Sequence, residues 1–247
     1  MSTILEVAGV SKTFGGVVAN RDITLEVAAG SIAGLIGPNG SGKTTLFNSI
    51  VGYHPIDAGS VRFDGREISR LRVPRIARLG LLRTFQQTRV YGGMTCIQNL
   101  LVSVPQREQS WRQIFRRPSA EDREKAEDLL RFVGLYKKRR LLAGDLSFGQ
   151  QKLLELAMAL QAEPRMLLLD EPTAGINPTL IQGLVNRLSR INEELGITLF
   201  VIEHNMHVIM NLAENIYCLA HGELLAAGGP EEVRSDERVI DAYLGAH

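Results

Sequence analysis

The chain has 247 residues, of which 45% are hydrophobic and 22% charged, so it carries enough apolar material for a sizeable core and is neither disordered nor fibrous. Its 28 basic and 27 acidic residues leave a net charge of +1, which gives no reason to expect nucleic acid as a partner. The two cysteines, Cys96 and Cys218, stand far apart in no metal-ligand spacing. Neither a disulfide framework nor a zinc site is therefore indicated, and both are expected to be packing residues.

The sequence contains no segment that resembles a membrane anchor. Residues 1–6 include no basic stretch leading into an apolar run, so we expect no secretory signal. The longest apolar runs, 166–169 and 199–202, are far shorter than the ~20 residues that a membrane-spanning helix needs. We therefore expect a cytoplasmic chain, and attachment to a membrane-inserted partner remains open.

The first third of the chain predicts antiparallel strands followed by a buried one. Residues 4–7 and 23–27 alternate apolar and polar side chains, which is typical of a sheet with one solvated face. Residues 32–36 are nearly all apolar and lead into a glycine-rich turn, which predicts a strand covered on both faces. A helix over 43–51 should follow. Shorter strands are expected at 61–63 and 81–84.

The middle of the chain predicts a helical subdomain, because residues 97–133 show helical periodicity around a charge-dense segment, 105–125. Beyond Ser147 helices alternate with buried strands, and this alternation predicts a parallel sheet. The expected elements are helices over 150–160 and 178–195, strands over 166–170 and 198–202, a strand pair near 217–219 and 223–227, and short helices near Glu231 and Val239.

A phosphate-binding motif lies between the expected strand at 32–36 and the helix that follows. Residues 37–44, GPNGSGKT, match G-x-x-x-x-G-K-[ST], whose glycines let backbone N–H groups surround phosphate oxygens at a helix N-terminus. Lys43 is expected to reach the β- and γ-phosphates, and Thr44 to ligate Mg²⁺. The other residues expected around the nucleotide are Asn39, Gly40, Ser41, Gly42 and Thr45. A glycine turn without a ligand is the alternative, and the flanking strand and helix disfavour it.

Two acidic residues end the apolar strand expected at 166–170. Successive residues of a strand point to opposite sides, so Asp170 is expected to face the Mg²⁺ beside Thr44 while Glu171 faces the attacking water. A strand that ends in two acids is a weak signal by itself. It gains weight because the phosphate-binding motif belongs to the same predicted sheet.

The segment 146–151, LSFGQQ, resembles the LSGGQ signature of the ATP-binding subunits of ABC transporters. The resemblance implies an α/β P-loop NTPase with the ABC ATPase fold: a mixed, largely parallel sheet, an antiparallel β-subdomain, and a helical subdomain at about 90–160 within one domain, 1–247. In that family the signature binds the γ-phosphate of the partner subunit's ATP. A head-to-tail dimer is thus implied, with Ser147 and Gly149 acting in trans. Gln150 of the same segment is also expected to bind nucleotide. Ser147 is expected to cap a helix that begins at Gly149, whereas Phe148 departs from the family's usual glycine.

Other elements of the family follow in order along the chain. Phe14, with Val18 beside it, resembles the aromatic residue that stacks on adenine. Gln86 matches the Q-loop glutamine that contacts Mg²⁺ and the lytic water, and His204 matches the switch histidine at the γ-phosphate. Asn177 stands where the D-loop usually has aspartate.

Four segments narrow the resemblance to the ATPases of branched-chain, or hydrophobic, amino acid importers. They are RTFQ at 83–86, EPTAGINP at 171–178, IEHNM at 202–206 and AYLG at 242–245. ATPases of urea or short-amide importers, and the ATPase of lipopolysaccharide export, share parts of this pattern and remain alternatives.

The resemblance implies an ATP hydrolase. Mg-ATP would be held by Lys43, Thr44, Gln86 and Asp170. Glu171 would polarise the attacking water with help from His204. The implied partners are two transmembrane permease subunits, a second ATPase subunit that is identical or homologous, and indirectly a periplasmic or extracellular solute-binding protein. The chain would act at the cytoplasmic face of the membrane, without nucleic acid.

Other classes that carry these motifs fit less well. DNA-repair ATPases of the ABC type insert a long coiled coil between the phosphate-binding motif and the signature, and this chain shows no sustained heptads there. Translation-associated relatives carry two cassettes, and a non-catalytic regulator would not need the intact Asp170–Glu171 pair. An arginine cluster either faces anionic groups or is a solvated helical face; it comprises Arg66, Arg70, Arg72, Arg75, Arg78, Arg83 and Arg89. We assign no role to residues 109–117.

Overall fold

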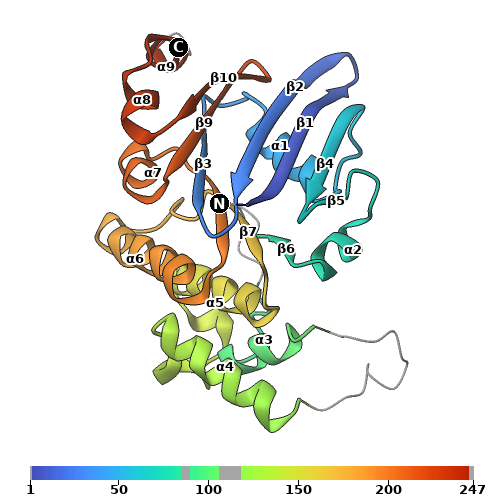
Figure 1. Ribbon diagram of the computed structural model, residues 1–247. Coiled ribbons are helices and arrows are strands. Elements are labelled where there is room, and N and C mark those ends of the chain that lie inside the picture. The colour runs from blue at the N-terminus through green and yellow to red at the C-terminus, as the bar shows by residue number, and fades with distance from the viewer. Residues whose placement is uncertain (1, 85–89, 106–117, 245–247) are drawn as a thin grey trace. The chain divides into compact units, whose positions relative to one another are not determined.

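The computed structural model describes residues 2–84, 90–105 and 118–244, and these form two compact units (Figure 1). The first unit consists of residues 1–83, 165–173 and 188–247, and the second of residues 84–164 and 174–187. The second unit is thus inserted in the sequence of the first. Helix α6, Pro178–Leu195, begins in the second unit and ends in the first. Among the described residues, no helix combines the length and the apolar character that a bilayer span requires.

The first unit contains a four-stranded antiparallel sheet with the strand order β2-β1-β4-β5. The strands are β1 (Thr3–Phe14), β2 (Val17–Ala28), β4 (Ala58–Phe63) and β5 (Arg66–Glu67). The predicted strands at 4–7 and 23–27 lie within longer ones, because β1 and β2 continue through register shifts to a tight turn at Gly15 and Gly16. The antiparallel expectation for this part of the chain is confirmed.

A six-stranded sheet with the order β10-β9-β3-β8-β7-β6 forms the rest of the first unit's framework. Its strands are β3 (Ile32–Ile36), β6 (Leu81–Arg83), β7 (Met166–Asp170), β8 (Thr198–Ile202), β9 (Asn215–Ala220) and β10 (Glu223–Gly228). Every neighbouring pair from β9 to β6 is parallel, and β10 alone pairs antiparallel. The predicted bounds of β7 and β8 are confirmed, since both strands are buried along their whole length.

The helices of the first unit are short, apart from the end of α6. They are α1 (Lys43–Ile50), α2 (Val73–Arg78), α7 (Met206–Leu212), α8 (Pro230–Ser235) and α9 (Glu237–Leu244). The predictions of α1 and of the terminal helices α8 and α9 are confirmed, whereas α2 and α7 were not predicted. Each of these two has six or seven residues, too few to establish a helical period.

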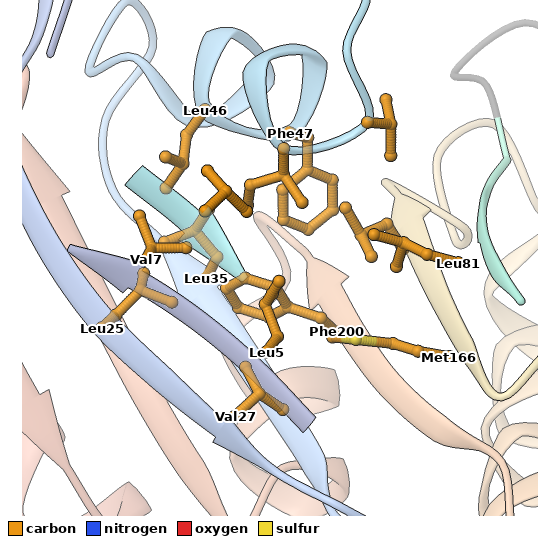
Figure 2. Packing of buried hydrophobic residues seen from close by; sticks show 14 of the residues in the cluster. Leu5, Val7, Leu25, Val27, Leu35, Leu46, Phe47, Leu81, Met166 and Phe200 are labelled. Atoms are coloured by element: carbon orange, nitrogen blue, oxygen red, sulfur yellow. The ribbon is translucent and has the colours of Figure 1, made fainter. Parts of the chain in front are cut away.

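A large buried cluster in the first unit lies between α1 and the two sheets (Figure 2). Phe47 of α1 packs on Phe200 of β8 with ring centroids 4.9 Å apart, while Leu5 and Val7 reach the same cluster from β1. Helix α1 therefore has a fixed position on the sheet, and the loop that precedes it is held at both of its ends.

The second unit is helical. Its elements are α3 (Cys96–Val102), α4 (Ala120–Phe132), α5 (Phe148–Gln161), the start of α6, and two 3₁₀ turns, η2 (Tyr136–Lys138) and η3 (Ala143–Asp145). Thr95 and Ser119 begin α3 and α4 with reciprocal side-chain and backbone hydrogen bonds, which satisfy first-turn amides. Leu100 of α3, Leu130 of α4 and Leu154 of α5 belong to the hydrophobic core of this unit.

Candidate active site

Three neighbouring parallel strands of the six-stranded sheet end at one edge, and this places the candidate site. Residues 37–44, hereafter the phosphate-binding loop, follow β3, whereas Asp170 ends β7 and Glu203 follows β8. The register pairs Leu35 of β3 with Ile202 of β8, and Ile202 with Asp170. Because the carboxyl ends of parallel strands meet at the same edge, residues far apart in sequence converge there.

Backbone constraints fix the shape of the phosphate-binding loop. Gly42, just before α1, has φ of 99°, and a Cβ atom on it would lie 2.2 Å from the carbonyl oxygen of Ala19. Gly37, at the other end, has φ of 142°, and a Cβ there would lie 2.0 Å from the carbonyl oxygen of Leu219. Both positions exclude any side chain, so the two glycines let the loop lie directly against β2 and β9.

Lys43 is buried, and its side chain folds back onto the phosphate-binding loop. Its Nζ donates hydrogen bonds to the carbonyl oxygens of Gly37 at 2.8 Å and Pro38 at 2.9 Å. Burial lowers the pKa of this ammonium group, and the negative charges of Glu171 and Asp170 oppose that shift. Lys43, Asp170 and Glu171, which the sequence analysis placed around one nucleotide, therefore interact electrostatically in the structure.

Asp170 is fixed by an arginine that the sequence analysis had assigned to a surface cluster. Arg83 Nη2 donates to Asp170 Oδ2 at 2.5 Å, and Arg83 Nη1 donates to Asn48 Oδ1 of α1. The prediction that Arg83 belongs with the exposed arginines is wrong. Strand β6 pairs with β7 in parallel, and the buried side chain of Arg83 forms an ion pair with Asp170 at the end of β7. The other described members of that cluster are exposed, namely Arg66, Arg70, Arg72, Arg75 and Arg78, and Arg89 lies outside the described residues.

Glu171 and His204 meet directly. His204 Nε2 lies 2.5 Å from Glu171 Oε1, although the two residues are 33 positions apart in the sequence. Glu171 adopts a left-handed backbone conformation with φ of 49°, and its N–H donates to the carbonyl oxygen of Ile202 at 2.9 Å. Such a conformation is uncommon for a residue other than glycine, and here it occurs directly after the end of β7.

Glu203 is a buried carboxylate beside these two residues that the sequence analysis did not single out. It accepts hydrogen bonds from Thr173 N at 2.9 Å and Thr173 Oγ1 at 2.6 Å, and from His204 N at 3.2 Å. It therefore connects the turn after Glu171 to the backbone of His204. Only its place next to His204 in the sequence could have indicated it, since one glutamate after a strand has no period or motif.

The candidate adenine-binding residues lie where β1 turns into β2. Phe14 ends β1 and is 43% exposed, and Val18 lies near the start of β2 and is 38% exposed. The Phe14 and His54 rings pack edge to face, and Lys12 Nζ lies 5.2 Å from the Phe14 ring centroid. Phe14 thus presents exposed aromatic surface at the turn of the hairpin, as stacking on a base requires.

The signature residues belong to the second unit. Ser147 is the N-cap of α5, and its N–H donates to Gln150 Oε1 at 3.2 Å. The helix begins at Phe148, one residue before the predicted start at Gly149. Phe148 packs against Gly175, where a Cβ atom would lie 2.9 Å from its ring. Asn177 accepts hydrogen bonds from Thr179 N and Oγ1 and so closes the N-terminus of α6.

Comparison with known families decides the class of this site. The sequence profile described as ABC transporter matches residues 20–174, which include the phosphate-binding loop, the signature and the Asp170–Glu171 pair. This chain belongs to the ABC transporter family. A second profile, described as branched-chain amino acid ATP-binding cassette transporter, matches residues 223–247.

Related ABC transporter proteins align along nearly the whole chain. BraF of Pseudomonas aeruginosa, a high-affinity branched-chain amino acid transport ATP-binding protein, is 39% identical over 98% of both chains. LivG of Escherichia coli, which has the same description, is 36% identical over 98% of both chains.

Solved ABC cassettes confirm the predicted fold class. The ADP conformation of an ATP-binding cassette of an ABC transporter superposes with a TM-score of 0.89 at 32% identity, covering 99% of this chain and 100% of that one. A nucleotide-free ATP-binding cassette gives a TM-score of 0.87 at 33% identity, covering 98% and 99%. The protein is therefore an ABC-type ATPase, as its motifs predicted.

Within this ABC ATPase the described structure does not reach every predicted site residue. Gln86 lies outside the described residues, as does the segment 109–117, so the predicted contact of Gln86 with Mg²⁺ and water stays a prediction. The structure does unite Lys43, Asp170, Glu171 and His204 in the first unit. It adds Arg83, Asn48 and Glu203 to them as neighbours.

Proposed function

We propose that this chain is the ATP-hydrolysing subunit of an importer for branched-chain amino acids. The observation that carries the solute class is the match of residues 223–247 to the branched-chain amino acid cassette profile, together with full-length similarity to BraF and LivG. The tail lies outside the part of the chain that the general ABC profile matches. It therefore separates this group from ABC ATPases at large.

Hydrolysis is assigned to residues at the common strand edge. Lys43 and the first-turn amides of α1 bind the β- and γ-phosphates, since the helix N-terminus presents N–H groups that have no intrahelical acceptor. Glu171 accepts the proton of the attacking water, and His204 orients that carboxylate through their 2.5 Å contact. The adenine stacks on Phe14 beside Val18.

The donor set also fits Mg²⁺. Asp170 Oδ1 is buried and has no hydrogen-bond partner among the described residues, whereas Oδ2 is occupied by Arg83. A buried carboxylate oxygen without a donor suits a hard cation, and Thr44, in the first turn of α1, carries a hydroxyl that can serve as a second oxygen ligand. When bound, Mg²⁺ would neutralise charge on the phosphate oxygens. Asp170 and Thr44, with Gln86, are the residues that we propose to hold it.

The chain is further proposed to work as one of two ATPase subunits on a pair of transmembrane permease subunits at the cytoplasmic membrane face, with an external solute-binding protein. Ser147, Gly149 and Gln150 would then contact the partner subunit's ATP. An ADP- and phosphate-bound ABC cassette of similar fold is described as dimeric. ATP binding would close such a dimer and hydrolysis would reopen it, which drives the permease.

The test is transport by the complete complex. The chain, its permease subunits and its second ATPase subunit are reconstituted in vesicles with the solute-binding protein, and uptake of labelled leucine, urea or acetamide is followed with ATP. Leucine uptake that stops with Glu171→Gln in this chain supports the proposal. Uptake of urea or acetamide alone would replace the solute class, and purification with a lipopolysaccharide-exporting membrane pair would replace import by export.

A further inference from the structure

The C-terminal helix α9 contacts the first residue of the phosphate-binding loop. Tyr243, in the last turn of α9, accepts a hydrogen bond through its hydroxyl oxygen from the backbone N–H of Gly37 at 2.8 Å. The two residues are separated by 206 positions in the sequence. Tyr243 has no role in the proposed hydrolysis, and in the sequence it stands within the ending AYLG, 242–245.

Gly37 is the residue at which the loop leaves the sheet, so this bond acts where the loop's course is set. Its backbone lies so close to β9 that no Cβ fits, and its carbonyl oxygen accepts the hydrogen bond from Lys43 Nζ at 2.8 Å. Tyr243 thus fixes the N–H of the same residue whose C=O holds the phosphate-binding lysine. Displacement of Gly37 would move a direct partner of Lys43.

Helix α9 is anchored well enough to transmit this constraint. Val239 is buried, and the helix packs on α8 and β10, two neighbours along the chain. Tyr243 itself is half-buried, and this burial raises its pKa to about 12, so the phenol stays protonated at neutral pH. The contact is therefore a neutral hydrogen bond between two positioned groups and is insensitive to pH in the physiological range.

We propose that Tyr243 is a positioning residue for the phosphate-binding loop, through which the C-terminal helix sets the affinity of the chain for ATP. The inference rests on the proposed function in one respect, that residues 37–44 bind the nucleotide phosphates. The bond to Tyr243 occupies the Gly37 amide. Phosphate binding is then left to the amides nearer the start of α1, which keeps the loop in one arrangement.

The first test is Tyr243→Phe, which removes the hydroxyl and keeps the ring, with Tyr91→Phe as the matched control because Tyr91 is exposed in the second unit. Binding of a fluorescent ATP analogue with Mg²⁺ is titrated on each full-length protein. One lost hydrogen bond predicts a dissociation constant raised about 3- to 10-fold in Tyr243→Phe alone. The KM for ATP should rise similarly, while kcat at saturating ATP stays within about twofold, since only nucleotide binding depends on the bond.

The second test uses the reciprocity of coupled sites. If loop and helix are coupled, ATP binding should slow amide hydrogen exchange in residues 237–244 of the wild-type chain, and Tyr243→Phe should abolish that protection. A lower thermal midpoint with unchanged ATP affinity and unchanged exchange would overturn the proposal, because Tyr243 would then only stabilise the tail. Failure of the wild-type chain to bind ATP would instead refute the function on which it rests.

Discussion

Arg83 and Asp170 form an ion pair, with Nη2 and Oδ2 2.5 Å apart, at the ends of two neighbouring parallel strands. Their side chains are only 5% and 1% exposed, so neither charge is solvated by bulk water. A buried pair contributes little net stability, yet removing one partner leaves a charge without compensation. Arg83 is therefore best tested by comparing single and double substitutions.

We expect Arg83→Met to lower the free energy of unfolding by about 3 kcal/mol, because it leaves the Asp170 carboxylate buried and unpaired. Arg78→Met, at an exposed arginine of α2, should change it by less than about 0.5 kcal/mol. The double variant Arg83→Met, Asp170→Leu should recover much of the loss. Urea unfolding of these variants, of Asp170→Leu and of the wild type measures the coupling, and strictly additive losses would show that the pair does not act as a unit.

Glu171→Gln tests the proposed general base. The amide keeps the shape of the side chain but cannot accept the proton of water, so we expect turnover to fall by ~10²-fold or more. ATP binding should persist, since Lys43 and the loop amides are unchanged. Phosphate release and nucleotide titration on the same preparation separate the two effects. Near-normal turnover in this variant would remove Glu171 from the role.

The phosphate-binding loop offers a matched pair of glycines. Gly40 has φ of 77°, and a Cβ atom added there would meet nothing within 4 Å, so Gly40→Ala should cost about 1 to 2 kcal/mol of stability from backbone strain alone. Gly42→Ala should cost clearly more, because its Cβ would also meet the Ala19 carbonyl oxygen at 2.2 Å. Thermal or urea unfolding without nucleotide compares them. Equal costs would show that the contact with β2 relaxes freely.

The sequence predicted the elements whose signals are local. Strands β7 and β8 are buried along their length and read as continuous apolar runs, and the phosphate-binding loop has its own motif between strand and helix. Arg83, Glu203 and Tyr243 could not be found in this way. Arg83 and Tyr243 each bind a residue that is distant in sequence, Asp170 and Gly37 respectively. Glu203 binds Thr173, which follows a different strand and lies nearby only because β7 and β8 are neighbours in the sheet. Their roles depend on strand order, which local periodicity does not encode.

Glu203 should position the proposed catalytic pair without touching substrate. Glu203→Ala removes the acceptor for Thr173 and for the His204 amide, so we expect turnover to fall roughly 10- to 100-fold through misplacement of His204 and Glu171. The milder Thr173→Val removes one of these bonds and should have a smaller effect. Turnover at saturating ATP is the measurement, with a nucleotide titration as the control for binding. Full activity in Glu203→Ala would limit Glu203 to a packing role.

The buried thiol of Cys218 in β9 should lower the free energy of unfolding at alkaline pH. The thiol is fully buried beside Ile36, and burial raises its pKa from 9.0 to about 11. The unfolded chain therefore releases this proton at lower pH than the folded chain, which favours unfolding as the pH rises from about 9 to 11. The difference in unfolding free energy between wild type and Cys218→Ala should be constant below about pH 8 and should shift against the wild type by roughly 2 kcal/mol near pH 11. Urea unfolding across this range measures it, and the tyrosines and lysines that also titrate there cancel in the difference. A difference that does not depend on pH would mean that the folded thiol ionises as readily as the unfolded one.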